Sequence, residues 1–143
     1  MLSHLLQRIE EIENQYQKSI MTPANEKNIE LVKEWISKNI KKNLWIKEYG
    51  DFLRKADGLE FNGLIIYNAN PNDVNNGIIG ANEIWHENEW NNRYLFLGDS
   101  DISWYCFDID YNVFVELDKP SGDVVEEFTS FNKMIEEAIN SVI

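Results

Sequence analysis

The residue types that most often perform catalysis are scarce in this sequence. It has two histidines, His4 and His86, and a single cysteine, Cys106. Cys106 falls between two aromatic residues of an expected strand, where a buried and inert thiol is the favoured interpretation. A dyad of Cys106 with His86 stays open as an alternative, although no other pattern supports it. No GxSxG, GxGxxG or phosphate-binding loop motif occurs, so we predict that the protein is not an enzyme.

Carboxylates in the second half of the chain resemble a metal site only in part. Residues Asp108–Asn112 match the first, third and fifth positions of a calcium-binding EF-hand loop. The sixth position of such a loop is glycine and the twelfth is glutamate, but this chain has Val113 and Lys119 there. The segment Gly98–Asp101 carries two further carboxylates in an expected turn, which needs no metal ion to form. We therefore predict no metal ion and no other cofactor.

The charge of the chain is uneven. Residues Met1–Gly58 carry ten basic and nine acidic residues, whereas Leu59–Ile143 carry three basic and sixteen acidic residues. The densest stretch, Tyr94–Phe128, has nine acids and Lys119 as its one base. Such a surface attracts cationic partners and repels nucleic acid and anionic membranes. Gly77–Gly80 has the GxxG spacing of a KH loop, but its apolar middle and acidic surroundings argue against nucleic-acid binding.

Composition and length predict a single cytoplasmic domain, 1–143. No stretch approaches the roughly 20 apolar residues of a membrane span, and the N-terminal segment lacks the apolar region and cleavage site of a signal peptide. One cysteine cannot form an internal disulfide bond, which favours a reducing compartment. The 143 residues match the usual size of one domain. The oligomeric state is not indicated.

Acids and a tryptophan are expected to share one face of a strand. Because alternate residues of a strand point to the same side, Asp108 and Asp110 fall on the same face as Trp104. The residues that alternate with these acids, Ile109 and Tyr111, then face the core. A face that mixes carboxylates with an aromatic ring suits the binding of a basic protein. The alternative is a solvated strand face with Trp104 packed under a neighbouring helix.

Two further tryptophans, Trp85 and Trp90, lie in a weakly patterned segment. Each either anchors that segment to the core or forms a binding hot spot in an interface. With the acids of the neighbouring turns and strand, the candidate partner-binding residues are Trp85, Asp99, Asp101, Trp104, Asp108, Asp110 and Glu116.

Apolar residues repeat at intervals of three and four at both ends of the chain, which predicts amphipathic helices. The first expected helix spans residues 2–19. A second begins at Thr22–Pro23, where a capping hydroxyl precedes proline. A third ends near Gly58, the expected left-handed C-cap, and the last begins after Thr129 or Ser130.

Between the third and the last helix the apolar pattern is that of strands. Residues 68–76 are expected to form a loop, and residues 78–90 are ambiguous between a short helix and an irregular segment. The expected strands are Leu64–Tyr67, Tyr94–Leu97, Trp104–Ile109, Val113–Leu117 and an edge strand Val124–Phe128. The order predicts an α+β fold with N-terminal helices, a mostly antiparallel sheet of four to six strands and a C-terminal helix.

Several patterns, in order along the chain, resemble the SUKH superfamily, closest to its bacterial members of the YobK type. They are Thr22–Ala24 at a helix start, Lys47–Gly58 as a helix ending in Asp-Gly, Tyr94–Asp99 as a strand ending in Gly-Asp, Val113–Leu117, and Ser130–Phe131 at the start of the last helix. The likeness covers most of the chain, with residues 1–20 as an extra N-terminal helix. It departs from the family at Asn43–Ile46, where a Leu-Pro pair is common.

The resemblance implies a function in protein binding. Bacterial members are immunity proteins, each of which binds a cognate polymorphic toxin, commonly a nuclease, and neutralises it without catalysis. An acidic inhibitor of this kind suits the basic cleft in which a nuclease holds phosphate. Eukaryotic and viral members are protein-interaction domains, so a regulatory or scaffolding domain without a toxin partner is the alternative.

Overall fold

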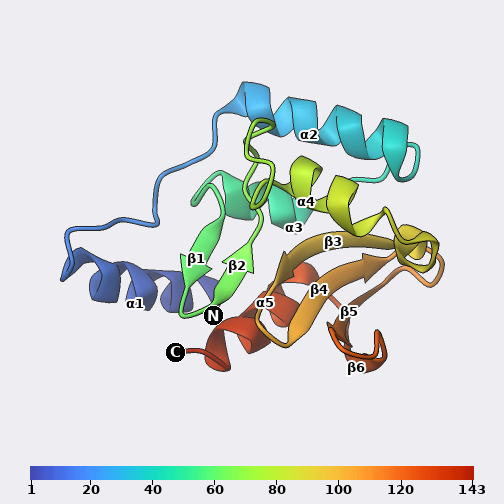
Figure 1. Ribbon diagram of the computed structural model, residues 1–143. Helices are drawn as coiled ribbons and strands as arrows, with labels where there is room; N and C mark the ends of the chain where they lie inside the picture. Colours follow the sequence, from blue (N-terminus) through green and yellow to red (C-terminus); the bar gives the residue numbers. More distant parts are fainter.

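The structure is a computed structural model that describes residues 1–143. The chain begins with three helices: α1 (Leu2–Asn14), α2 (Glu26–Asn39) and α3 (Lys47–Leu53). An extended segment separates α1 from α2 (Figure 1), whereas residues of α1 and α3 line a common hollow. None of the helices is long and apolar enough to cross a lipid bilayer.

The sheet begins with a short hairpin of β1 (Leu59–Phe61) and β2 (Leu64–Ile66). The chain then forms α4 (Ile78–Trp85) and a short 3-10 helix, η1 (Glu89–Arg93), before it returns to the sheet. The ambiguity of residues 78–90 is thus resolved as two short helical segments. The strand β1 was not predicted from the sequence, because three residues are too few to display an alternating pattern.

Four longer elements complete the sheet: β3 (Tyr94–Asp99), β4 (Ser103–Asp108), β5 (Val113–Asp118) and β6 (Val124–Phe128). The final helix, α5 (Phe131–Asn140), follows at once. All six strands are antiparallel and each pairs with the next in the chain, so the sheet is a meander with β6 at one edge. This architecture confirms the predicted α+β fold and the edge position of the last strand.

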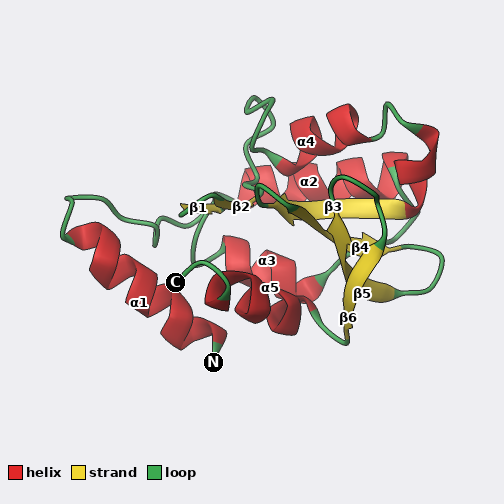
Figure 2. Ribbon diagram, turned by 60° about the horizontal axis from the view of Figure 1, so that its bottom comes forward, coloured by secondary structure: helices red, strands yellow, loops and turns green.

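Helices lie on both sides of the middle of the sheet. Figure 2 shows α4 on one side of β3 and the pair α3 and α5 on the other. On the side of α3 and α5, the rings of Tyr49, Phe52 and Phe131 pack with centroids 5.6 to 6.5 Å apart. The helix α1 packs against α5 through its buried residues Leu6 and Ile9. The sheet therefore has a helical layer on each face at its centre.

The ends of the helices differ in part from the sequence predictions. The N-cap of α2 is Asn25, whose side chain accepts a hydrogen bond from the Asn28 amide, so the predicted start at Thr22–Pro23 is wrong. Ser130 caps α5 by accepting a hydrogen bond from the Lys133 amide, as expected. Gly58 has the left-handed conformation, with φ of 82°, but α3 has already ended at Leu53. The glycine instead turns the chain into β1.

A side chain of α4 completes the edge of β3. The short strand β2 pairs with β3 only at Gly98 and Asp99, so the edge of β3 that faces away from β4 has no neighbouring strand along its first half. The fully buried Asn82 fills this place: its amide Nδ2 donates to the Phe96 carbonyl and its Oδ1 accepts from the Phe96 amide, both at 2.8 Å. The same Nδ2 also donates to the Ile78 carbonyl. Backbone groups that would otherwise be buried without partners are thereby satisfied.

Candidate protein-binding surface

The structure distributes the seven candidate residues over three places. Trp85, Asp99 and Trp104 belong to a buried cluster between α4 and the sheet. Asp108 and Asp110 lie at the turn between β4 and β5. Asp101 and Glu116 line a surface hollow beside the end of α5. The seven residues therefore do not form one continuous surface.

The first place is an aromatic cluster that buries Trp104. Its ring lies 5.4 Å from that of Trp85, 5.7 Å from Phe96 and 6.0 Å from Trp90, measured between centroids. Trp104 is 7% exposed, so its predicted place on an open binding face is wrong and the alternative of packing under a helix is correct. Trp90 covers this cluster from outside and is half exposed. Trp85 anchors α4 to the sheet.

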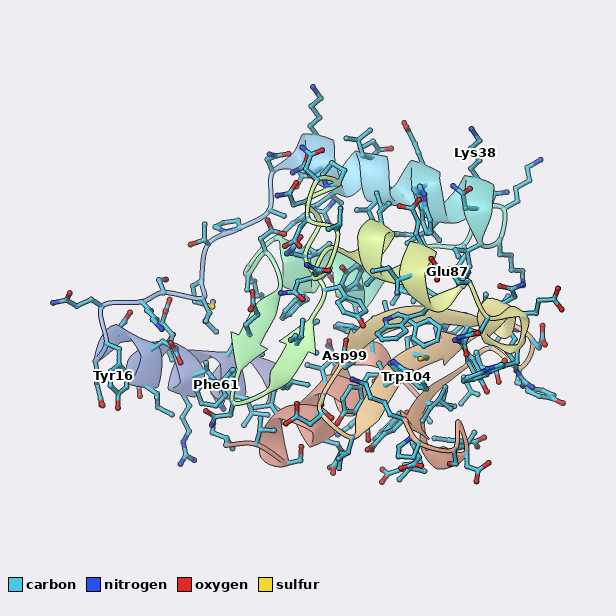
Figure 3. All side chains as sticks on the ribbon, in the orientation of Figure 1. Tyr16, Lys38, Phe61, Glu87, Asp99 and Trp104 are labelled. Atoms are coloured by element: carbon cyan, nitrogen blue, oxygen red, sulfur yellow. The ribbon has the colours of Figure 1, made fainter.

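Asp99 takes part in a polar network at the margin of this cluster. Its carboxylate accepts hydrogen bonds from the Tyr67 hydroxyl and from Lys119 Nζ, the latter at 3.1 Å. The Trp85 indole donates to the same hydroxyl at 3.0 Å. Burial and the nearby Asp99 carboxylate raise the pKa of Tyr67 far above its ordinary value. Figure 3 shows Asp99 and Trp104 near each other, on adjacent strands. Because Lys119 pairs with it, Asp99 adds little net charge to the surface.

The second place is the β4–β5 turn, where Asp108 is structural. Its buried carboxylate pairs with Arg93 at 2.7 Å and accepts hydrogen bonds from the amides of Asp110 and Tyr111. The predicted shared face of Asp108 and Asp110 is wrong, because β4 ends at Asp108 and Asp110 lies in the turn. Tyr111 is 73% exposed rather than in the core, and stacks under the Arg93 guanidinium. The hydrogen bond with Asp108 raises the pKa of Arg93.

The third place is a hollow of about 280 Å³ whose lining includes two carboxylates and no basic side chain. Neither Asp101 nor Glu116 forms an ion pair, and Glu116 accepts a hydrogen bond from the Ser103 hydroxyl at 2.7 Å. The C-terminal end of α5 adds the partial negative charge of its carbonyl groups. The lining residues are Asn62, Gly63, Ser100, Asp101, Ile102, Tyr105, Glu116, Ser141 and Val142. The hollow is thus suited to a positively charged group.

The hairpin of β5 and β6, residues 113–128, continues this negative surface. Glu116 lies directly opposite Glu126 across the two strands, so two carboxylates share one face. None of the acids of the hairpin forms an ion pair: Glu116, Asp118, Asp123, Glu126 and Glu127. We call this segment the acidic hairpin. Glu126 and Glu127 were not among the predicted candidates, although two consecutive acids in an expected edge strand were the available signal.

A larger hollow of about 470 Å³ lies elsewhere, between the segment that follows α1 and the strand β1. Its charged side chains are of both signs, with Glu13, Asp57 and Glu60 beside Lys18. It contains none of the candidate residues. Unlike the hollow at Asp101, this hollow contains a basic side chain among its acids.

Cys106 and His86 are the groups that were considered for catalysis. Cys106 is fully buried, and burial raises the pKa of its thiol well above the ordinary value. The His86 ring is hydrogen-bonded through Nε2 to the Tyr94 carbonyl, at 2.7 Å. No hydrogen bond joins Cys106 to His86. No group of three or more His, Cys, Asp or Glu side chains is placed to hold a metal ion.

No protein-family model matches the chain. A search of curated proteins finds no significant match.

Proposed function

We propose that this protein is an immunity protein that binds a cognate polymorphic toxin, a nuclease with a basic cleft, and neutralises it through a stoichiometric complex without catalysis. The proposal joins the ordered sequence resemblance to the SUKH superfamily with one structural observation. That observation is the absence of ion pairs at Asp101, which shares a hollow with Glu116, and at every acid of the acidic hairpin.

Local pairing of charge supports this choice of surface. Asp99 and Asp108 are each paired with a base and hold the fold together. Asp101 and Asp123 are exposed and unpaired, so their charge is available to a partner. A nuclease cleft that holds phosphate is positively charged, and complementary charge accelerates association at low ionic strength. The contact surface we propose is thus centred on Asp101 and the hairpin, away from Trp104.

Co-expression tests the function directly. The probe is the nuclease domain of the toxin encoded beside the gene for this protein. We expect growth to be rescued in cells that make both proteins, a one-to-one complex in size-exclusion chromatography, and loss of nuclease activity in the purified complex. A complex that leaves nuclease activity unchanged would contradict neutralisation and favour the regulatory or scaffolding alternative.

Charge reversal tests the surface. The double variant Asp101→Lys/Asp123→Lys changes two exposed carboxylates that form no ion pair. We expect its association rate with the toxin to fall about tenfold at low salt, with a weaker salt dependence. The control is Glu11→Lys/Glu34→Lys, which changes net charge equally on α1 and α2. An equal effect of both double variants would show that only net charge matters and would refute this surface.

A further inference from the structure

The strand β6 has an outer edge without a neighbouring strand, although α5 packs against part of it. It pairs with β5 alone, and no hydrogen bond to any other segment engages its backbone. Val124 and Val125 are 49% and 57% exposed, and the next two residues are also exposed. Figure 1 shows β6 at the outer end of the sheet. Its outer row of backbone donors and acceptors is therefore available for one more strand.

The charge of this edge determines which strand can be added. Natural edge strands are often protected from pairing with another chain by lysine or other charged residues, by proline or by bulges. Here the regular part of β6 carries Glu126 and Glu127, and Val125 forms a bulge with no partner in β5. A second copy of the chain, aligned along this regular part, would place these glutamates against each other. Like charges directly opposite are destabilising, so the edge disfavours self-association and favours a basic segment.

We propose that β6 is a docking edge on which an extended, basic segment of the partner pairs as a seventh strand. The identity of the partner rests on the proposed function, but the mode of binding does not. Consecutive residues of a strand point to opposite faces, so Glu126 and Glu127 offer one carboxylate on each face of the sheet. The added strand therefore carries two consecutive basic residues, one opposite each glutamate.

A synthetic peptide tests this edge without any toxin. The probe is a capped octapeptide of alternating threonine and valine with a central lysine-arginine pair. Its binding to the full chain is followed by nuclear magnetic resonance titration and by amide hydrogen exchange. We expect shifts centred on residues 124–128 and new exchange protection at alternate amides of β6, because those amides gain carbonyl partners.

Backbone methylation separates strand pairing from simple charge attraction. Two isomeric peptides carry N-methyl groups on alternate residues, one set on the edge that faces β6 and the other on the opposite edge. Their charge and composition are identical. We expect one isomer to bind about tenfold more weakly than the parent, the change expected when two backbone hydrogen bonds are lost, and the other to bind as the parent does.

A matched pair of protein variants tests the charge requirement. Glu126→Lys/Glu127→Lys is expected to weaken peptide binding at least tenfold, while Glu11→Lys/Glu34→Lys changes it less than threefold. Equal binding of both methylated isomers, shifts confined to the hollow at Asp101, or no peptide binding would overturn the docking edge. None of these results bears on toxin neutralisation, which the co-expression experiment decides separately. Conversely, failure of neutralisation with intact peptide pairing would leave the docking edge in place.

Discussion

The aromatic cluster around Trp104 and the acidic hairpin both combine carboxylates with apolar side chains. In the cluster these groups are paired or buried, whereas in the hairpin they are unpaired and exposed. In the cluster, Asp99 is paired with Lys119, and Trp104 is buried by rings from α4 and η1. In the hairpin, five carboxylates form no ion pair and two valines are exposed. The formal charge of a segment therefore does not indicate its role. Pairing and burial decide which acids maintain the fold and which can meet a partner.

The largest expected difference between these regions is in stability. Trp104→Ala removes a buried ring and should lower the free energy of unfolding by about 3 to 5 kcal/mol, because little can fill the cavity. The matched change in the hairpin, Val125→Ala, removes an exposed side chain and should alter it by less than about 0.5 kcal/mol. Urea denaturation followed by circular dichroism measures both. Similar costs at the two positions would remove the distinction between a structural and an exposed region.

A second test concerns the amide that completes the β3 edge. Asn82→Ala leaves buried backbone groups of Phe96 without partners, so we expect a loss of about 3 kcal/mol in the free energy of unfolding. The control is Asn92→Ala, since Asn92 is exposed and its side chain forms no hydrogen bond. Denaturation in urea gives the two values. A cost below about 1 kcal/mol for Asn82→Ala would mean that water replaces the amide at this edge.

Alkaline pH should lower the free energy of unfolding through the aromatic side of the sheet and not through the hairpin acids. Burial raises the pKa of Tyr67 in the folded protein above its ordinary value of 10.0. Stability from this group is full below pH 10 and falls as the pH rises further, because the unfolded state then loses the proton more readily. Above pH 10, each such tyrosine lowers the free energy of unfolding by about 1.4 kcal/mol per pH unit.

Comparison of the wild type with Tyr67→Phe isolates this contribution. Urea denaturation between pH 8 and pH 11 should show a shallower alkaline decline in the variant, by the share of one tyrosine. The rest of the decline belongs to other buried groups such as Tyr49, whose pKa is also raised by burial. Identical slopes for the two proteins would place the ionisation elsewhere.

The smallest expected effect is a gain in stability in the hairpin. Glu126→Lys replaces the repulsion across the strands between Glu116 and Glu126 with an attraction. We expect the free energy of unfolding to rise by about 0.5 kcal/mol, less at high salt. Thermal denaturation at two ionic strengths resolves this change. A clear loss of stability would show that Glu126 maintains the fold, as Asp108 does, and would bring the two regions closer together.

Periodic patterns in the sequence were sufficient to predict most of the fold. The strands from Tyr94 onward and the cap at Ser130 follow from alternation and from capping chemistry, which act within a few residues. The short strand β1 could not be predicted, since its three residues are defined by pairing with β2. The start of α2 at Asn25 shows that a local signal at Thr22–Pro23 can lose to another cap nearby.

The candidate site was less accessible from the sequence than the fold. The strand of Asp108 ends at that residue, so an alternating pattern extended through Asp110 gave a wrong shared face. Neutralisation of Asp99 depends on Lys119, twenty residues later in the chain, and only tertiary structure brings them together. By contrast, Asp101 is exposed and Glu116 is partly exposed, and their part in partner binding stays a prediction. Which acids are paired is a long-range property that spacing does not encode.

The meander order of the sheet has a consequence for local opening. Every strand bonds only to its sequence neighbours, and β6, the last of them, has a single partner. It can detach from β5 without breaking any other strand pair, so its amides should exchange hydrogen by a small local opening rather than by global unfolding. A segment with this independence can be ordered by a ligand at little cost to the remaining sheet. A weakly protected edge strand of the free protein then becomes the one that reports occupancy.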